Sequence, residues 1–175
     1  MKSLNLSITV LSLSILAAPS YAQDKPKLSD AEVASVAVVA NQIDISYAEI
    51  AKEKSKDAEV IKFAETMIRD HNAVIGQASA LVKKLGVTPK DNAVSQKLMA
   101  GADQTKKSLR AKSGKAFDKD YIDNEVSYHK AVISTVEDVL IPETENAELK
   151  ELLQNVVPAL KTHLSHAEMV QKAFK

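Results

Sequence analysis

Three of the four histidines in this chain stand where a helix would direct its side chains into a protein core. His71, His129 and His163 each replace an apolar residue in a stripe of apolar side chains that recurs at three- and four-residue steps. Each stripe belongs to a different predicted helix, and each histidine lies near the midpoint of its helix. In an antiparallel bundle the three imidazoles would lie at a similar height, within about two turns or ~11 Å along the axis.

A carboxylate is expected to join the histidines from a fourth predicted helix. Asp44 shares a helix face with Ala37, Ala48 and Ala51, whose small side chains leave room for a short polar group to point inward. Three imidazoles and one carboxylate from four helices suit a single transition-metal ion, either zinc, copper, nickel or iron. Further ligands, or partners that orient an imidazole, are expected at three positions in helical register with these residues: Asp70, Glu125 and His166.

The same residues also have a purely structural interpretation. A histidine in an apolar stripe is often a core residue that hydrogen-bonds to a carboxylate or carbonyl of the next helix, and Asp44 could reach solvent. Three histidines at matching height favour a functional site, because burying several titratable groups costs stability. The sequence lacks the Glu-x-x-His pairs of a di-iron centre, a glycine-rich phosphate loop and a His-Glu-x-x-His zinc-protease motif.

The elements that must position these side chains are all predicted to be helical. Apolar residues recur at three- and four-residue steps along almost the whole chain after the first 29 residues. Ser29 and Glu32 predict a capping box at the start of the first helix. Gly86, followed by Pro89, predicts the end of the second, and Pro142 predicts that the fourth stops nearby. The predicted helices are 30–54, 58–85, 92–111, 115–140 and 146–174.

The order and lengths of these helices predict the fold class. Four of them are long, with short turns inside each pair, and the helix at 92–111 lies in a long connection between the pairs. This pattern is typical of an all-α, ferritin-like four-helix bundle with one long crossover that contains an additional short helix. The bundle domain is expected to span residues 30–175, after a linker at 23–29.

Residues 1–22 have the features of a cleavable signal peptide. One cation, Lys2, precedes an apolar run that ends at Ala18, and small residues lead to Ala22, after which we predict cleavage. The run is shorter than the ~20 apolar residues of a spanning helix, so no integral membrane association is expected after cleavage. The protein is therefore predicted to be periplasmic or secreted.

Composition narrows the classes of function. The chain has 23 basic and 23 acidic residues, so its bulk charge gives no reason to expect a nucleic-acid partner. It has no cysteine, which excludes disulfides, iron–sulfur clusters and cysteine-ligated zinc. Any metal must therefore be held by His, Asp and Glu. An envelope protein partner and a homo-oligomer are both left open.

Four segments, taken in order, carry a resemblance to a known family. They lie within residues 29–174 and read SDAEVASVAVVANQIDISYAEIAKEKS, FAETMIRDHN, KAFDKDYIDNEVSYHKAVI and VPALKTHLSHAEMV. The chain resembles exported, ferritin-like bacterial proteins grouped as domain of unknown function 4142 and proposed to be outer-membrane proteins. The resemblance implies a ferritin-like fold, an extracytoplasmic location and recurrent histidines at His71, His129 and His163. It also implies an acidic position at Asp44, where family members more often have Glu, but no established activity.

Three functions remain compatible with these observations. The favoured hypothesis is an exported, non-enzymatic bundle whose histidine-rich internal site binds one transition-metal ion for storage, delivery or stress protection. An alternative is a non-catalytic structural or interaction module of the cell envelope, whose histidines are core hydrogen-bonding residues. A third is a hydrolytic or redox metalloenzyme, which would need an open coordination position and access for solvent.

Overall fold

Helices account for nearly all of the described chain, which is residues 27–174 of a computed structural model, and no strand occurs in that range. The predicted all-α architecture of four long helices with a further helix in the crossover is confirmed. The predicted signal peptide and its cleavage after Ala22 lie outside the described residues. The main helices are α1 (Asp30–Lys54), α2 (Ala58–Leu85), α3 (Ala93–Arg110), α4 (Gly114–Thr135) and α6 (Ala147–Gln171).

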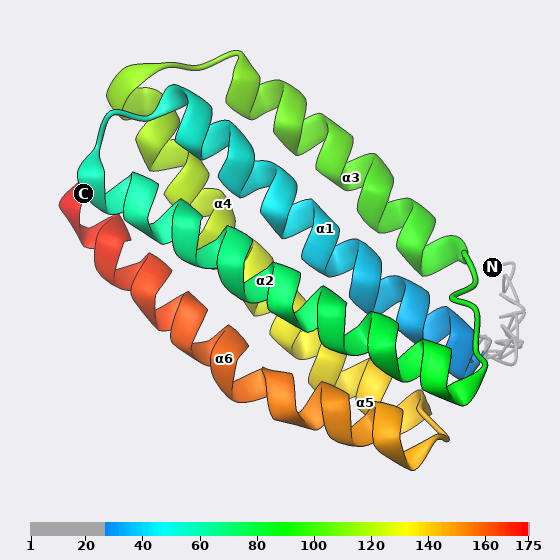
Figure 1. Cartoon of the computed structure of the whole chain (residues 1–175). Coiled ribbons are helices and arrows are strands. Elements are labelled where there is room, and N and C mark those ends of the chain that lie inside the picture. The colour runs from blue at the N-terminus through cyan, green and yellow to red at the C-terminus, as the bar shows by residue number, and fades with distance from the viewer. Residues whose placement is uncertain (1–26, 175) are drawn as a thin grey trace, which may run out of the picture.

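The four long helices enclose the core as two antiparallel pairs (Figure 1). One pair is α1 with α2 and the other is α4 with α6, while α2 also packs on α6 and α1 on α4. The crossover helix α3 runs along the outside of α1 and returns the chain to the opposite end of the bundle. Because of this return, α4 runs parallel to α2, and the helices that pack against each other in the core are antiparallel.

The ends of α1 and α2 follow from local hydrogen bonding. The Glu32 carboxylate accepts hydrogen bonds from the backbone N–H (3.0 Å) and the hydroxyl (2.7 Å) of Ser29, as expected for the predicted capping box. The Asp57 carboxylate caps α2 by accepting from the backbone N–H groups of Glu59 and Val60. Gly86 ends α2 in the left-handed conformation, with φ of 65°.

The C-terminal end of α4 differs slightly from the prediction. After Thr135 the chain continues through a π-helical turn, η1 (Val136–Leu140), and then, beyond the predicted end at Leu140, through a final short turn, α5 (Ile141–Glu143). The N–H of Ile141 donates to the carbonyl of Val136, five residues earlier. Pro142 has no N–H to donate and crowds the turn before it, and a widened turn is one of the ways in which a helix accommodates such a residue.

The buried side chains form two clusters, one on each side of the mid-height of the bundle. The aromatic cluster, toward the C-terminal end of α1, contains four large rings and Met67: Tyr47, Phe63, Phe117 and Tyr121. The aliphatic cluster, toward the N-terminal end of α1, is built from leucine, isoleucine and valine, with Leu140 and Leu153 among its most buried members. His129 and His163 lie between these two clusters in the sequences of α4 and α6, and His71 follows the aromatic cluster's Met67 in α2.

The cap at Asp57 predicts a measurable contribution to stability. Replacing its carboxylate by a methyl group in Asp57→Ala removes the acceptor for two backbone N–H groups at the start of α2. We expect the free energy of unfolding, measured by urea denaturation, to fall by about 1 kcal/mol. Asp57→Asn keeps an acceptor oxygen and should retain most of that stability. Equal losses in the two variants would show that charge, and not capping, is responsible.

Candidate metal centre

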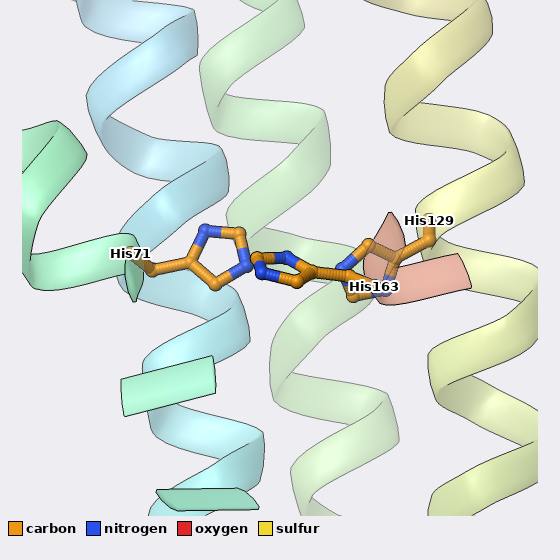
Figure 2. Close-up of side chains that lie close together, drawn as sticks. All are labelled: His71, His129 and His163. Atoms are coloured by element: carbon orange, nitrogen blue, oxygen red, sulfur yellow. The ribbon is translucent and has the colours of Figure 1, made fainter. Parts of the chain in front are cut away.

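The structure brings one histidine from each of α2, α4 and α6 together in the middle of the core. The ring centroids of His71, His129 and His163 are 5.3 to 5.8 Å apart, and one ring nitrogen of each lies within 4.8 Å of the others. Their exposed fractions are only 4%, 1% and 6%, respectively. Figure 2 shows the three rings directed toward one another. The helices therefore place the histidines at the same height, as their sequence positions predict.

The orientation of His71 is set by a short relay of hydrogen bonds from α1. The side-chain amide of Asn41 donates to the carbonyl of Ala37 (2.8 Å), which leaves its Oδ1 atom facing His71. The Nδ1 atom of His71 lies 2.7 Å from that oxygen. Because an amide oxygen can only accept, Nδ1 of His71 carries the proton. Its Nε2 atom then presents a lone pair.

The other two histidines are oriented in the same manner. The Nδ1 atom of His129 lies 3.0 Å from the backbone carbonyl of Glu125, one turn earlier on α4. The Nε2 atom of His163 lies 3.0 Å from a carboxylate oxygen of Asp70 on α2. Both partners accept hydrogen bonds, so each of these nitrogens carries a proton. The lone pairs are therefore on Nε2 of His129 and on Nδ1 of His163.

The inner nitrogens of the three histidines have no hydrogen-bond partner within the described part of the chain. They are Nε2 of His71, Nε2 of His129 and Nδ1 of His163, and all three are buried. Each outer nitrogen is held by a polar group, whereas each inner nitrogen presents a lone pair in the core. Outer hydrogen bonds of this kind fix the tautomer and ring orientation of histidines that bind metal ions.

Asp44 lies beside the inner nitrogens, fully buried on α1. Its Oδ2 atom is 3.4 Å from Nε2 of His71 and 3.6 Å from Nε2 of His129. Neither carboxylate oxygen has a hydrogen-bond partner among the described residues. Burial raises the pKa of this carboxyl group from its ordinary value to about 8. The arrangement thus places one carboxylate from α1 beside two of the three imidazoles, those of His71 and His129.

Glu125 forms a second acidic group next to the cluster. It is fully buried, and one carboxylate oxygen lies 3.5 Å from Nδ1 of His129. A ligand atom of Glu125 also lies within 4.8 Å of one from Asp44. Burial raises the pKa of Glu125 well above its usual range, and the charge of Asp44 raises it further. The two carboxyl groups therefore favour a neutral or proton-sharing state in the absence of a cation.

The three imidazoles are neutral near pH 7. Burial lowers the pKa of His71 to about 3 and that of His129 to about 4. Burial also lowers the pKa of His163, although the hydrogen bond to Asp70 acts in the opposite direction. A neutral imidazole is the form that binds a metal ion. Three neutral nitrogen donors and one carboxylate can hold zinc, copper, nickel or iron.

The other predicted site residues have different positions. Asp70 orients His163 from a partly exposed position: burial alone would raise its pKa, but hydrogen bonds from Arg69 and His163 lower it overall. His166 is not brought into the three-histidine group, and its ring packs edge-to-face on Phe63 with centroids 5.1 Å apart.

Sequence reasoning missed Asn41, which orients His71. The signal available for it was its position three residues before Asp44, on the same face of α1.

The pKa of Asp44 predicts how the metal-free protein responds to alkaline pH. The folded chain holds the Asp44 proton up to about pH 8, whereas the unfolded chain releases it near pH ~3.9, so stability falls as pH rises between these values. The lowered histidine pKa values act oppositely, but their effect ends above pH ~6.5. We expect Asp44 to lower the free energy of unfolding by about 1.4 kcal/mol per pH unit between roughly pH 6.5 and 8.

Urea denaturation in the presence of a chelator measures this slope. Asp44→Asn removes the titrating group and should reduce the slope by about the same 1.4 kcal/mol per pH unit, while the contribution of Glu125 remains. A slope that is identical in the wild type and in Asp44→Asn would contradict the prediction, because Asp44 would then be ionised in the folded protein.

Two solved structures share the fold. One is CopM in its Cu(II)-bound form, with a TM-score of 0.63 and 17% identity, covering 85% of this chain and 100% of that chain. The other is a DUF305 protein from Streptomyces coelicolor, proposed to be secreted, with a TM-score of 0.69 and 15% identity. This second match covers 83% of this chain and 93% of the other. At these identities the likeness is one of fold.

The comparison with curated proteins gives no match. A family model described as a domain of unknown function, DUF4142, matches residues 16–170, which include Asp44, the three histidines and the three residues that orient them. This chain therefore belongs to the DUF4142 family.

Proposed function

We propose that this protein binds one transition-metal ion in the centre of the bundle, without catalysing a reaction. The ligands are His71, His129, His163 and Asp44. Among divalent ions, copper generally binds such nitrogen and oxygen donors most strongly, ahead of nickel, zinc and iron. Storage, delivery or protection against metal stress would each use a buried site of this kind.

One observation carries the proposal. The inner nitrogens of all three histidines and both oxygens of Asp44 are buried without a hydrogen-bond partner in the described chain. One ring nitrogen of each histidine lies within 4.8 Å of the others, and Asp44 Oδ2 lies 3.4 and 3.6 Å from Nε2 of His71 and His129. Buried polar atoms in a native protein are normally paired, because an unpaired one costs about 1–3 kcal/mol. A single cation would supply the missing partner for these donors at once.

The purely structural interpretation explains only one of the two nitrogens of each histidine ring. Hydrogen bonds to Asn41, to the carbonyl of Glu125 and to Asp70 satisfy one nitrogen of each ring. A structural role gives no reason for the second nitrogen of all three rings to meet at one point beside a carboxylate. The interaction-module alternative therefore predicts no stoichiometric metal, and the same experiment distinguishes it from the proposal.

The comparisons support testing copper first. CopM, whose fold is similar, binds Cu(II) in its solved structure. At this low identity, the ligand positions of CopM cannot be transferred to this chain. The case for this chain therefore depends on its own four proposed ligands. Zinc, nickel and iron remain alternatives, since the same donor set accepts each of them.

The location that we propose is the periplasm or the exterior of the cell, reached through the signal peptide at residues 1–22. The DUF305 neighbour, itself proposed to be secreted, supports this location. Within residues 27–174, no helix is long and apolar enough to cross a membrane. The ferritin-like classification of the bundle and an envelope protein partner or homo-oligomer belong to the same proposal. The outer-membrane description of the family is not adopted.

Elemental analysis of untagged mature protein tests the metal site. We expect about one copper, zinc, nickel or iron ion per chain in the wild type, and less than about one tenth of that in a His71→Ala, His129→Ala, His163→Ala variant, because three of four ligands are lost. The matched control is His166→Ala, which removes the fourth histidine, outside the cluster, and should keep its metal.

Circular dichroism must show that the triple variant remains helical. The single variant Asp44→Asn provides a second test if it does not, because it removes one ligand and changes the volume little. Absence of metal from the wild type, together with no thermal stabilisation by any of the four ions, would reject the proposal. Equal metal loss in His166→Ala would show that the ion lies elsewhere.

The hydrogen bond from His163 to Asp70 predicts a graded loss of affinity. Asp70→Ala removes the acceptor that holds the tautomer and orientation of His163, without removing a ligand. Loss of such a partner typically weakens metal binding by about 10- to 100-fold. Competition with a chelator of known affinity measures the change. Asp103→Ala, an exposed carboxylate on α3, is the matched control and should bind like the wild type; equal affinity in Asp70→Ala would contradict the prediction.

A further inference from the structure

The core is hollow on one side of the histidine cluster. A cavity of about 340 Å³ lies between α1, α2, α4 and α6 and reaches into the aliphatic half of the bundle. Seven alanines and seven valines are among the residues that line it. Six leucines also line it, and the alanines on the facing helices leave a volume that larger side chains would fill. The volume falls within the ~300–1,000 Å³ range of small-molecule pockets.

The hollow is confined to one half of the core. On the other side of the histidines, Phe63, Phe117 and Tyr121 are fully buried, and their rings pack together with centroids 6.2 Å apart in each contact. Protein interiors are normally packed to the density of organic crystals. The contrast between the two halves therefore indicates a local cavity and not a loosely folded bundle.

Gln77 and Thr135 also line this cavity, but its unpartnered polar atoms belong to the histidine cluster. Asp44, His71, His129 and His163 all line it, and these residues carry the unpartnered inner atoms. The alanine and valine walls offer nothing to hydrogen-bond, and apolar cavities of even ~150 Å³ can stay dry and bind small apolar molecules. A ligand that matches the cavity would thus be mainly aliphatic, with one polar end beside the histidines.

The charges around the cavity argue against an anionic ligand. None of the described lining residues is lysine or arginine, so an anionic ligand would have no cationic partner. The inner nitrogens of His71 and His129 accept hydrogen bonds, as do the carboxylate oxygens of Asp44. We infer that the cavity binds an uncharged aliphatic molecule with a terminal hydroxyl group, which donates to an inner histidine nitrogen while its chain lies along the alanine and valine walls.

The uncharged fluorescent dye N-phenyl-1-naphthylamine tests this inference on metal-free mature protein. We expect dye fluorescence to rise and to saturate at about one dye per chain. The alcohol 1-octanol should displace the dye, whereas octanoate at the same concentration should not, because its charge has no partner in the cavity. Since no metal is needed, failure of this binding and failure of the metal proposal are separate results.

Two variants fill the cavity from different helices. Ala37→Phe on α1 and Val74→Phe on α2 each place a ring at a lining position, and each should weaken dye binding at least tenfold. Ala80→Phe adds the same ring to an exposed position of α2 outside the lining and should change affinity less than twofold. Circular dichroism shows which variants are folded, and one folded cavity variant is enough to test the inference.

Three results would overturn the inference. They are absence of saturable dye binding to the wild type, unchanged dye affinity in a folded cavity variant, and displacement by octanoate as effective as by 1-octanol. The first would mean that the cavity does not hold a ligand, the second that the dye binds elsewhere, and the third that the ligand is not selected against negative charge. Stoichiometric metal with any of these results would leave the metal proposal intact.

Discussion

A layer of buried polar side chains at mid-height constrains the relative positions of the four long helices. Burying such groups is costly unless each finds a partner, and here the partners lie partly on neighbouring helices. Asn41 of α1 orients His71 of α2, and Asp70 of α2 orients His163 of α6. Sliding α2 by one residue against either neighbour would break one of these hydrogen bonds. The helix register and the orientation of the imidazoles therefore depend on each other.

The two halves of the core differ in how closely they pack against this polar layer. The aromatic half, with Phe63 and Tyr121 fully buried, packs tightly and fixes the height and spacing of the helices next to the histidines. The aliphatic half leaves a cavity that ends at the same histidines. One side of the cluster is thus rigidly supported, and the other side has room for a ligand. A binding site needs this asymmetry, because its histidine nitrogens must be held in place on one side and be accessible to a ligand on the other.

The sequence predicted the helices well because their ends depend on local chemistry. The caps at Asp57 and Gly86 act within a few residues, and α1 and α2 have the predicted bounds. The common height of the histidines followed from helix length and periodicity. The position of Asn41 one turn before Asp44 indicates a place near the site, but its partner could not be predicted, because an amide on a helix face gives no sign of which neighbour it meets. The cavity was also missed, since periodicity shows which side of a helix is inside but not how completely that side is filled.

The metal-free bundle has sources of stability that do not involve the histidine cluster. At the end of the aliphatic half, the Asp30 carboxylate accepts hydrogen bonds from the backbone N–H groups of Glu145 and Asn146, and Glu143 accepts one from Leu28. The aromatic half closes the other side of the layer. A cation bound at the cluster would therefore add stability that grows with the logarithm of its concentration relative to its dissociation constant, and its release would leave these contacts in place, as reversible storage or delivery requires.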